Sequence, residues 1–245
     1  MTSLKKHLIR VTNMIKKILF RKYLTSLIIV LILVPLISTA IREGVKAESL
    51  ERYYAGYEYG APDTFGISAR IFTINPNVPE GNFLAQRICI LISADNAYWI
   101  QVGYDKNISQ GHGNPCYYYE VYDENGWRLI YPPIRGPQPS STYIYYISGA
   151  SGTHWLISIC DITGESILST TVETVPFASQ ELEAFSEATT ESISIDGTHF
   201  SQSKYFHREP PYVLWDQHVA EIYPSNAPYS IQVVSDHEFY ASGGG

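Results

Sequence analysis

The sequence predicts an all-β protein, a two-sheet antiparallel β-sandwich that follows an N-terminal hydrophobic signal or anchor helix. Short runs rich in β-branched and aromatic residues recur from about residue 67 to residue 234, and clusters of Gly, Pro and Asn separate them. No long segment after the N-terminal region shows the 3.6-residue period of an amphipathic helix. Many short strands at this spacing are typical of a sandwich or a barrel.

The first 47 residues differ in kind from the rest of the chain. Basic residues gather between Lys5 and Lys22, and residues 24–41 are almost wholly apolar. Basic residues followed by an apolar run are typical of an export signal, and a run of about 18 residues is also just long enough to span a bilayer. The small residues Val45 and Ala47 predict cleavage after Ala47, in preference to a second candidate site at Ser38-Thr39-Ala40. A retained membrane anchor is the alternative. Either outcome places the remainder outside the membrane, as a secreted or a cell-surface protein.

The predicted domains are therefore the leader, residues 1–47, a sandwich over residues 48–240, and a flexible tail over residues 241–245. The whole chain has a formal charge of −7. Nine of its Lys and Arg residues lie in the leader, so residues 48–245 keep 8 basic against 23 acidic residues, a net charge near −15. Such a body repels polyanions, so we expect no nucleic acid as a partner. This negative charge either serves solubility alone or indicates that the protein acts in an acidic medium.

Ten runs in the exported part are expected to be strands. They are residues 67–74, 87–93, 98–104, 116–122, 143–148, 155–161, 166–172, 181–185, 212–215 and 229–234. The run 153–161 shows the alternation most clearly, because Trp155, Ile157 and Ile159 share one side of a strand. That side is expected to face the core.

Cysteines and histidines indicate no metal or cofactor site. Cys89, Cys116 and Cys160 match no zinc spacing, and they allow either one disulfide with a free thiol or no disulfide. The histidines are scattered, and each is more typical of a structural or solvated residue than of a ligand. We expect no cofactor, no metal and a monomeric chain.

The strand around Gln101 carries the first candidate functional residue. Tyr98, Trp99, Ile100 and Val102 make it strongly strand-like, and an amide side chain stands in its middle. Gly103 follows, and a strand glycine often marks a close approach of another backbone.

The run 181–187 carries the second candidate. Glu181 and Glu183 are two residues apart in an expected strand and therefore project from the same face. A carboxylate that activates water and an amide that donates to the developing oxyanion can together hydrolyse a peptide bond. The alternative is that both are solvated strand residues, since Glu187 and Glu191 extend the same acidic run.

Five segments between residues 53 and 206 resemble the eqolisins, the acid-acting glutamic endopeptidases of fungi, and their bacterial relatives. Residues 53–57, 71–76, 100–105, 117–122 and 178–185 are similar, in this order, to five motifs of that family. The motifs are Asn-Trp-Ala-Gly, Phe-Thr-Val-Pro, a Gln-x-Gly strand, Trp-Tyr-Glu-Trp-Tyr and Glu-Trp-Ile-Val-Glu.

The resemblance implies a concanavalin A-like sandwich of the jelly-roll kind, in which Gln101 and Glu183 are the catalytic residues. Glu183 would be the base that activates water, and Gln101 would stabilise the oxyanion. With a carboxyl near its ordinary pKa, about 4.3, such a site works best in acid. We assign substrate contacts to Tyr98, Tyr118 and Glu120, together with Glu181, and expect a protein or peptide substrate.

The chain departs from the family in two places. The family's Trp-Val-Gly-Ile-Asp-Gly before the glutamine strand falls on residues 90–95, which lack the tryptophan and both glycines. Ser179 and Gln180 stand where the glutamate motif begins with Glu and Trp.

Two other functions stay open. Paired carboxylates also suit glycoside hydrolysis, but the run 181–187 carries Glu where related glucanases have a central Asp. A tyrosine-rich sheet with an inactive site is the second alternative, a lectin-like module that binds carbohydrate or an extended peptide.

Overall fold

The computed structural model describes residues 51–60, 64–92, 98–149, 153–174, 179, 181–206, 212–216, 220–221 and 228–245. The chain divides into two compact units, residues 1–49 and 50–245. The predicted leader, residues 1–47, and its cleavage site lie outside the described residues, so both stay predictions. No helix in the described part of the chain has the length and apolar character needed to cross a membrane.

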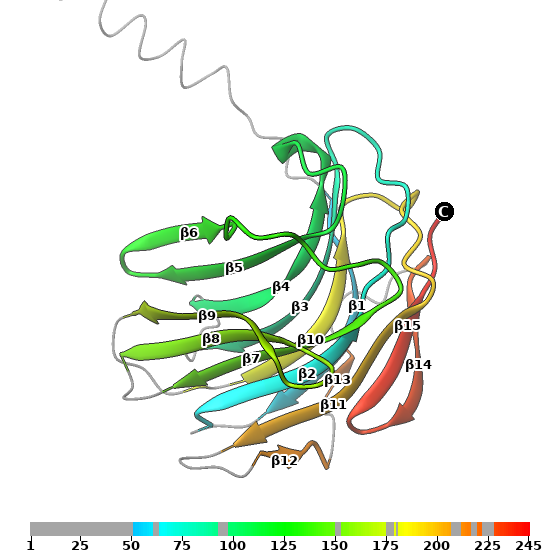
Figure 1. Cartoon of the computed structure of the whole chain (residues 1–245). Coiled ribbons are helices and arrows are strands. Elements are labelled where there is room, and N and C mark those ends of the chain that lie inside the picture. Colours follow the sequence, from blue (N-terminus) through cyan, green and yellow to red (C-terminus); the bar gives the residue numbers. More distant parts are fainter. Residues whose placement is uncertain are drawn as a thin grey trace, which may run out of the picture. The chain divides into compact units, whose positions relative to one another are not determined.

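The described residues of the second unit form two antiparallel β-sheets, which confirms the predicted all-β class (Figure 1). We call them sheet A and sheet B. Sheet A has the strand order β13-β1-β10-β3-β4-β5-β6, and sheet B has the order β14-β15-β11-β2-β7-β8-β9, with β12 paired to β11. Half of the neighbouring pairs along each sheet are not consecutive in sequence, so the two sheets are assembled by crossovers as well as by hairpins.

The strands of sheet A are β1 (Tyr53–Gly60), β3 (Phe83–Leu91), β4 (Trp99–Asn107), β5 (Cys116–Asp123), β6 (Gly126–Ile130), β10 (Glu181–Ala188) and β13 (Ala220–Glu221). The strands of sheet B are β2 (Gly66–Phe72), β7 (Thr142–Gly149), β8 (His154–Asp161), β9 (Ser166–Glu173), β11 (Thr198–Phe206), β12 (Val213–Leu214), β14 (Ser230–Ser235) and β15 (Glu238–Ser242). A short 3₁₀ turn, η1 (Ile108–Gln110), follows β4.

Each of the ten expected strands overlaps a strand of the structure, although the bounds move by up to four residues. The largest shift is in β3, which begins at Phe83 rather than Arg87. This shift brings Arg87 and Cys89 to the middle of a strand. The alternation expected for residues 153–161 is confirmed, because Trp155, Ile157 and Ile159 are all buried.

The core lies between the sheets and is built from alternate residues of each strand. From sheet A it takes Tyr57, Ile88 and Tyr104, and from sheet B it takes Tyr145 and Phe200, all with no exposed surface. Because side chains of a strand alternate between its two sides, the residues between these core positions project away from sheet B. That outward face of sheet A carries the candidate site.

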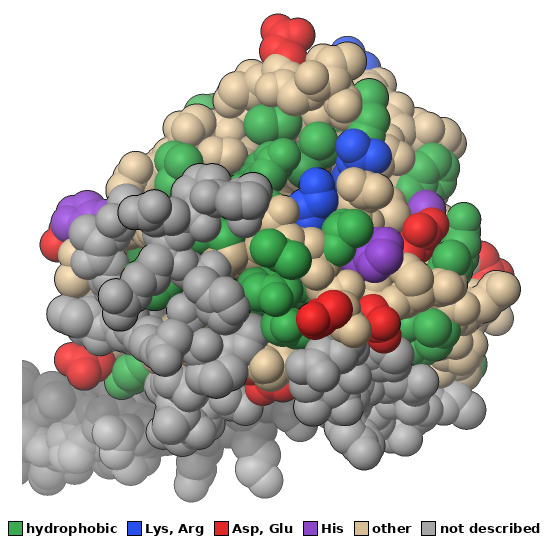
Figure 2. All heavy atoms as spheres, turned by 90° about the horizontal axis from the view of Figure 1, so that it is seen from below, with side chains coloured by type: hydrophobic (Ala, Val, Ile, Leu, Met, Phe, Trp, Pro, Cys, Tyr) green, Lys and Arg blue, Asp and Glu red, His purple; other side chains and the backbone are tan. Residues whose placement is uncertain are grey.

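The remaining surface is mixed in character. On the face seen in Figure 2, basic, acidic and histidine side chains stand among apolar and uncharged ones. Cys89, Cys116 and Cys160 are all free, which decides between the two cysteine arrangements that the sequence left open.

Candidate active site

One row of side chains crosses the outward face of sheet A at right angles to the strands. Glu183 of β10 is paired with Cys89 of β3, and Cys89 is paired in turn with Gln101 of β4. The row continues to Glu58 of β1 on one side and to Glu120 of β5 on the other. Directly paired residues project from the same side of a sheet, so the two predicted catalytic residues face the same space. Their Cα atoms are two strand spacings apart, about 10 Å, with Cys89 between them.

The next row along the strands contains Phe185, Arg87, Gly103 and Tyr118. A Cβ atom at Gly103 would lie 2.0 Å from the carbonyl oxygen of Gln86, so only glycine allows this approach of β3 and β4. The close approach that the sequence predicted for Gly103 is confirmed, and it fixes the spacing of the two strands beside Gln101.

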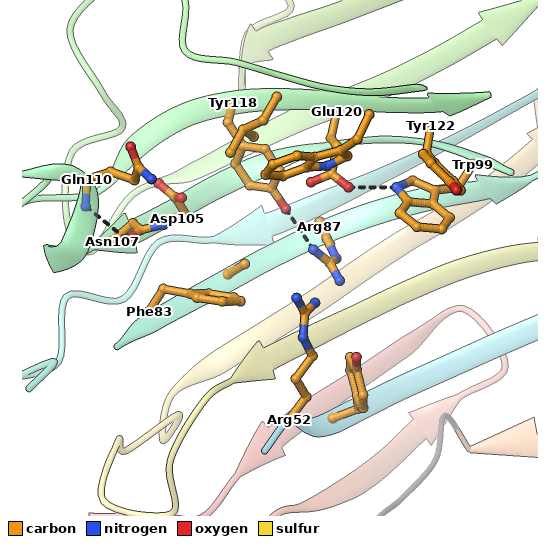
Figure 3. A pocket seen from close by; sticks show the side chains of 14 residues that line it. Arg52, Phe83, Arg87, Trp99, Asp105, Asn107, Gln110, Tyr118, Glu120 and Tyr122 are labelled. Atoms are coloured by element: carbon orange, nitrogen blue, oxygen red, sulfur yellow. Dashed lines mark hydrogen bonds between the residues drawn. The ribbon is translucent and has the colours of Figure 1, made fainter. Parts of the chain in front are cut away.

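Two adjoining cavities open on this face, with volumes of about 590 and 320 Å³. Sizes of this order are typical of ligand pockets. The smaller cavity, which we call the catalytic pocket, is lined by Arg52, Tyr54, Glu58, Arg87, Cys89, Leu91, Trp99, Gln101, Glu120, Glu183 and Phe185. The larger cavity, which we call the aromatic pocket, shares Arg52, Tyr54, Arg87, Trp99 and Glu120 with it and adds residues such as Tyr118, Tyr122, Trp127 and Leu129 (Figure 3).

Gln101 presents a free amide to the catalytic pocket. Its side chain is only 3 % exposed. Within the described part of the chain, no hydrogen bond engages the amide group. A buried amide normally finds a partner, so this group is available to a bound molecule.

Glu183 is partly exposed, and its pKa is raised to about 7. Burial is the largest cause, and the charges of Glu181 and Glu187 add to it. The charge of Arg87 and a hydrogen bond from the Cys89 thiol act in the opposite direction and lower the pKa. This pKa lies above the ordinary carboxyl value expected from the sequence. The neighbouring Glu181 and Glu187 are visible in the sequence, but the burial of Glu183 is not.

Glu58 is a further carboxyl in the row, and sequence reasoning missed it. It is paired with Glu183 across β1 and β10, and its pKa is raised to about 7 by burial and by the charges of Glu181 and Glu183. Two adjacent carboxyls with raised pKa values share protons more readily than they both ionise. The strand pairing of β1 with β10 creates this neighbour, and no local sequence signal identifies it.

The structure brings two of the four predicted substrate contacts into the pockets. Tyr118 lines the aromatic pocket, and Glu120 lines both pockets. The indole Nε1 of Trp99 donates to Glu120 Oε1 at 2.7 Å, which holds that carboxylate in place (Figure 3).

The other two predicted contacts lie apart from the pockets. Tyr98 packs against the core between the sheets, and its ring contacts Tyr122 at 5.8 Å. Glu181 projects from the same face as Glu183 but does not line either pocket, and it acts through its charge on Glu58 and Glu183. Tyr98 lies an odd number of residues from Gln101, so side-chain alternation turns it toward the side of Ile100 and Val102, which are buried in the core.

Three more pocket residues were missed from the sequence. Arg52 and Arg87 form ion pairs with the buried Glu187, and Trp127 is 61 % exposed at the rim of the aromatic pocket. Arg87 had a usable signal, since it stands two residues before Cys89 in an expected strand. Among the described residues, no group of three His, Cys, Asp or Glu side chains is arranged to hold a metal ion.

Comparison with known proteins gives similarity in structure only. No family model and no curated protein sequence matches the chain. Scytalido-glutamic peptidase, solved with a transition state analog inhibitor, superposes with a TM-score of 0.60 at 14 % identity, over 80 % of this chain and all of that one. SCP-B, a member of the eqolisin family of peptidases solved with the tripeptide Ala-Ile-His, gives 0.53 at 14 % over the same shares. Chicken galectin 2 gives only 0.34 at 8 %.

The chain thus has the sandwich fold of the glutamic peptidases. At this identity the likeness shows the fold alone, and the chemistry of the site has to be inferred from the side chains present in this chain. The side chains of β3 matter most for that chemistry. The structure places Arg87, Cys89 and Leu91 beside Gln101, so the central position between the two predicted catalytic residues is occupied by a thiol.

Proposed function

We propose that this chain is a peptide hydrolase of the glutamic type, with Glu183 as the general base and Gln101 as the donor to the oxyanion. The observation that supports this most strongly is the row Glu183–Cys89–Gln101 at the floor of one pocket. A carboxyl with a raised pKa and a buried amide without a protein partner face the same space, as two-residue acid–base catalysis requires.

The proposed reaction needs no group beyond these side chains and a water molecule. The Glu183 carboxylate takes a proton from water, and the water oxygen attacks the carbonyl carbon of the peptide bond. The carbonyl oxygen becomes negative and accepts hydrogen bonds from the Gln101 amide. Glu183 then gives its proton to the leaving nitrogen, the C–N bond breaks, and a carboxylic acid and an amine are released.

The pH range of this activity follows from the protonation of Glu183. A general base acts only when it is ionised, and the pKa of about 7 makes Glu183 largely neutral in acid. The activity should therefore lie nearer neutral pH than the low pH suggested by the acidic composition. A base whose pKa is close to the working pH also transfers protons most effectively.

The test is hydrolysis of a denatured protein by the full chain at about pH 7.5, followed by mass spectrometry of the products. We expect Glu183→Gln and Gln101→Ala each to lower kcat/KM by about 100-fold or more. Glu181→Gln is the matched control, since Glu181 lies on the same strand face but outside the pocket. It should retain most activity at this pH, because loss of its charge can only lower the pKa of Glu183 and favour the ionised base. Unchanged activity in both Glu183→Gln and Gln101→Ala would remove these assignments.

A non-catalytic binding module is the second candidate, and the exposed Trp127 favours it. An exposed tryptophan beside Tyr122 and Leu129 offers a flat apolar surface for a sugar ring or for a peptide side chain. Retention on a polysaccharide column that is lost in Trp127→Ala, with no hydrolysis of any protein, would support this candidate. We also propose that the protein, whether hydrolase or binding module, acts outside the membrane. This part of the proposal rests only on the basic and apolar leader.

A further inference from the structure

Two arginines meet at the floor shared by the catalytic and aromatic pockets. Arg87 projects from the middle of β3, and Arg52 stands just before β1. Both line both pockets, and no other Lys or Arg among the described residues lines either one. Figure 3 shows the two guanidinium groups pointing toward one another. In a body with so few basic residues, two positive charges in one pocket indicate a specific role.

A single carboxylate serves both arginines. Glu187 has no exposed side-chain surface, and each of its oxygens accepts from one arginine: Oε1 from Arg52 Nη1 at 2.7 Å, and Oε2 from Arg87 Nη2. Both oxygens of Glu187 are thus occupied, and two positive charges face one negative charge. In the described part of the chain, neither arginine forms an ion pair with any other carboxylate.

The remaining donors of the arginines are poorly used. Arg87 Nε is buried with no hydrogen-bond partner, and Arg87 Nη1 reaches only the hydroxyl of Tyr118, at 3.4 Å. The ring of Phe185 lies 4.4 Å from the centre of the Arg87 guanidinium and fixes its plane. Arg52 has a side chain that is 52 % exposed and lines both pockets, where Tyr54 is its further hydrogen-bond partner. A guanidinium held in one plane with free donors is well suited to bind a carboxylate.

Two other acidic groups of the pockets are held by neutral donors. Glu120 accepts from Trp99, and Asp105 accepts from the hydroxyl of Tyr131 at 2.6 Å. Burial raises the pKa of Asp105 to about 7. A carboxylate on a bound molecule therefore competes mainly with Glu187, which pairs with both arginines, and with Glu120, whose charge acts on Arg87.

We propose that Arg52 and Arg87 form a subsite for a substrate carboxylate. The pocket would then select peptides that carry a negative charge near the peptide bond to be cleaved, which lies between the side chains of Gln101 and Glu183. The position of the cleaved peptide bond rests on the proposed function, but the binding of a carboxylate by the two arginines does not. Arg87 is two residues along β3 from Cys89, about 7 Å, which an extended peptide covers in about two residues. The carboxylate belongs either to an Asp or Glu side chain or to the free C-terminus of the peptide.

Binding without hydrolysis tests the subsite directly. The full chain with Glu183→Gln is titrated with four short peptides of one sequence, which differ only in Asp against Asn and in a free against an amidated C-terminus. The fluorescence of Trp99 and Trp127, which line the pockets, reports binding. We expect a carboxylate to improve affinity by about 10-fold at low salt, the size of one charge-assisted hydrogen bond.

Variants then show whether the arginines are responsible. Adding Arg52→Gln should remove most of the preference, and Arg52→Lys should keep part of it, because a point charge remains. Arg70→Gln is the matched control, since Arg70 lies on β2 in sheet B, away from both pockets. Thermal melting checks that each variant is folded.

The outcomes separate this inference from the proposed function. A preference for Asp alone identifies an acidic side chain as the ligand, and a preference for the free C-terminus alone identifies the chain end. Equal affinity for all four peptides overturns the subsite, as does a preference that survives in Arg52→Gln. If the unmodified chain hydrolyses no peptide but the preference is present, the hydrolase proposal fails and the subsite stands. If the chain hydrolyses peptides but shows no preference for a carboxylate, the subsite fails and the hydrolase proposal stands.

Discussion

Cys89 occupies the position between the two proposed catalytic side chains. It is 2 % exposed, and burial, followed by the charge of Glu183, raises the pKa of its thiol. The thiol therefore stays protonated near neutral pH and donates a hydrogen bond to Glu183. A donor to a carboxylate stabilises its ionised form, so Cys89 keeps Glu183 a stronger acid than burial alone would allow.

The change Cys89→Ala tests this contribution at the scale of a single residue. Loss of the thiol donor should raise the pKa of Glu183 further, so that the rise of kcat/KM with pH moves to higher pH. The pH dependence of hydrolysis measures the shift. Cys160→Ala on sheet B serves as the control and should leave the profile in place, whereas a profile unmoved in Cys89→Ala would mean that the thiol does not act on Glu183.

At the scale of the element, the pair β3 and β4 holds the site together. Gln101 and Cys89 are direct partners in this pair, and Gly103 lets the two backbones approach beside them. Any side chain at residue 103 must move β3 away from β4 or distort both. The spacing of Gln101 and Glu183 depends on the position of β3 between them.

Gly103→Ala should therefore destabilise the sandwich. The added Cβ would overlap the Gln86 carbonyl, and overpacking of this kind costs about 1–3 kcal/mol. For a domain of this size each kcal/mol lowers Tm by about 2–4 °C. Gly113→Ala is the matched control, because its Cβ would meet no atom within 4 Å. Equal melting temperatures for the two variants would show that the close approach has no structural role.

Local patterns predicted most strands but not their partners. The strands β3, β4, β5 and β8 were found because β-branched and aromatic residues dominate them. The strand β11 was missed because its register with β2 shifts between Ser201 and Lys204, and Gln202 there has a φ of 55°. This irregularity breaks the two-residue period on which strand prediction relies. The pair Asn125-Gly126 between β5 and β6 is typical of a hairpin turn, so this hairpin carries a local signal.

The candidate site shows the same division between local and distant information. Gln101 and Glu183 could be chosen as candidates from the sequence, because each has a suitable side chain and stands within a recognisable strand. Their alignment across Cys89 could not, because it depends on the order β10-β3-β4, and these strands are far apart in the chain. The roles of Arg52 and Glu58 depend on the pairing of β1 with β10 and were invisible for the same reason.

At the scale of the whole molecule, several buried carboxyls make stability depend on pH. Burial raises the pKa of Asp105, Glu183 and Glu58 to about 7 in the folded chain, from ordinary values of 3.8 for Asp and 4.5 for Glu. The folded state therefore binds more protons than the unfolded state between these values. The stabilisation from each protonated carboxyl is complete below about pH 4 and is lost as pH rises through about 7.

Asp105→Asn isolates one of these groups, because Asn resembles the protonated side chain at every pH. The melting temperature of the unmodified chain relative to this variant should fall as pH rises from about 4 to about 7. Asp161→Asn is the control, because hydrogen bonds from Thr163 lower the pKa of Asp161 below its ordinary value of 3.8. Asp161 therefore stays ionised in the folded and the unfolded chain above about pH 5, and its variant should keep a constant difference in melting temperature from there to about pH 7. A constant difference between the unmodified chain and Asp105→Asn would show that the buried carboxyl does not titrate in this range.

The pH dependence of kcat/KM for peptide hydrolysis by the full chain tests the central claim most directly, because it reports the ionisation of Glu183 in the free protein. Measured from about pH 4 to about pH 9, the rate should rise with a midpoint near 7, the pKa of Glu183. A rate that is highest near pH 3–4 and disappears before neutral pH would contradict the role of Glu183 as an ionised base in this pocket.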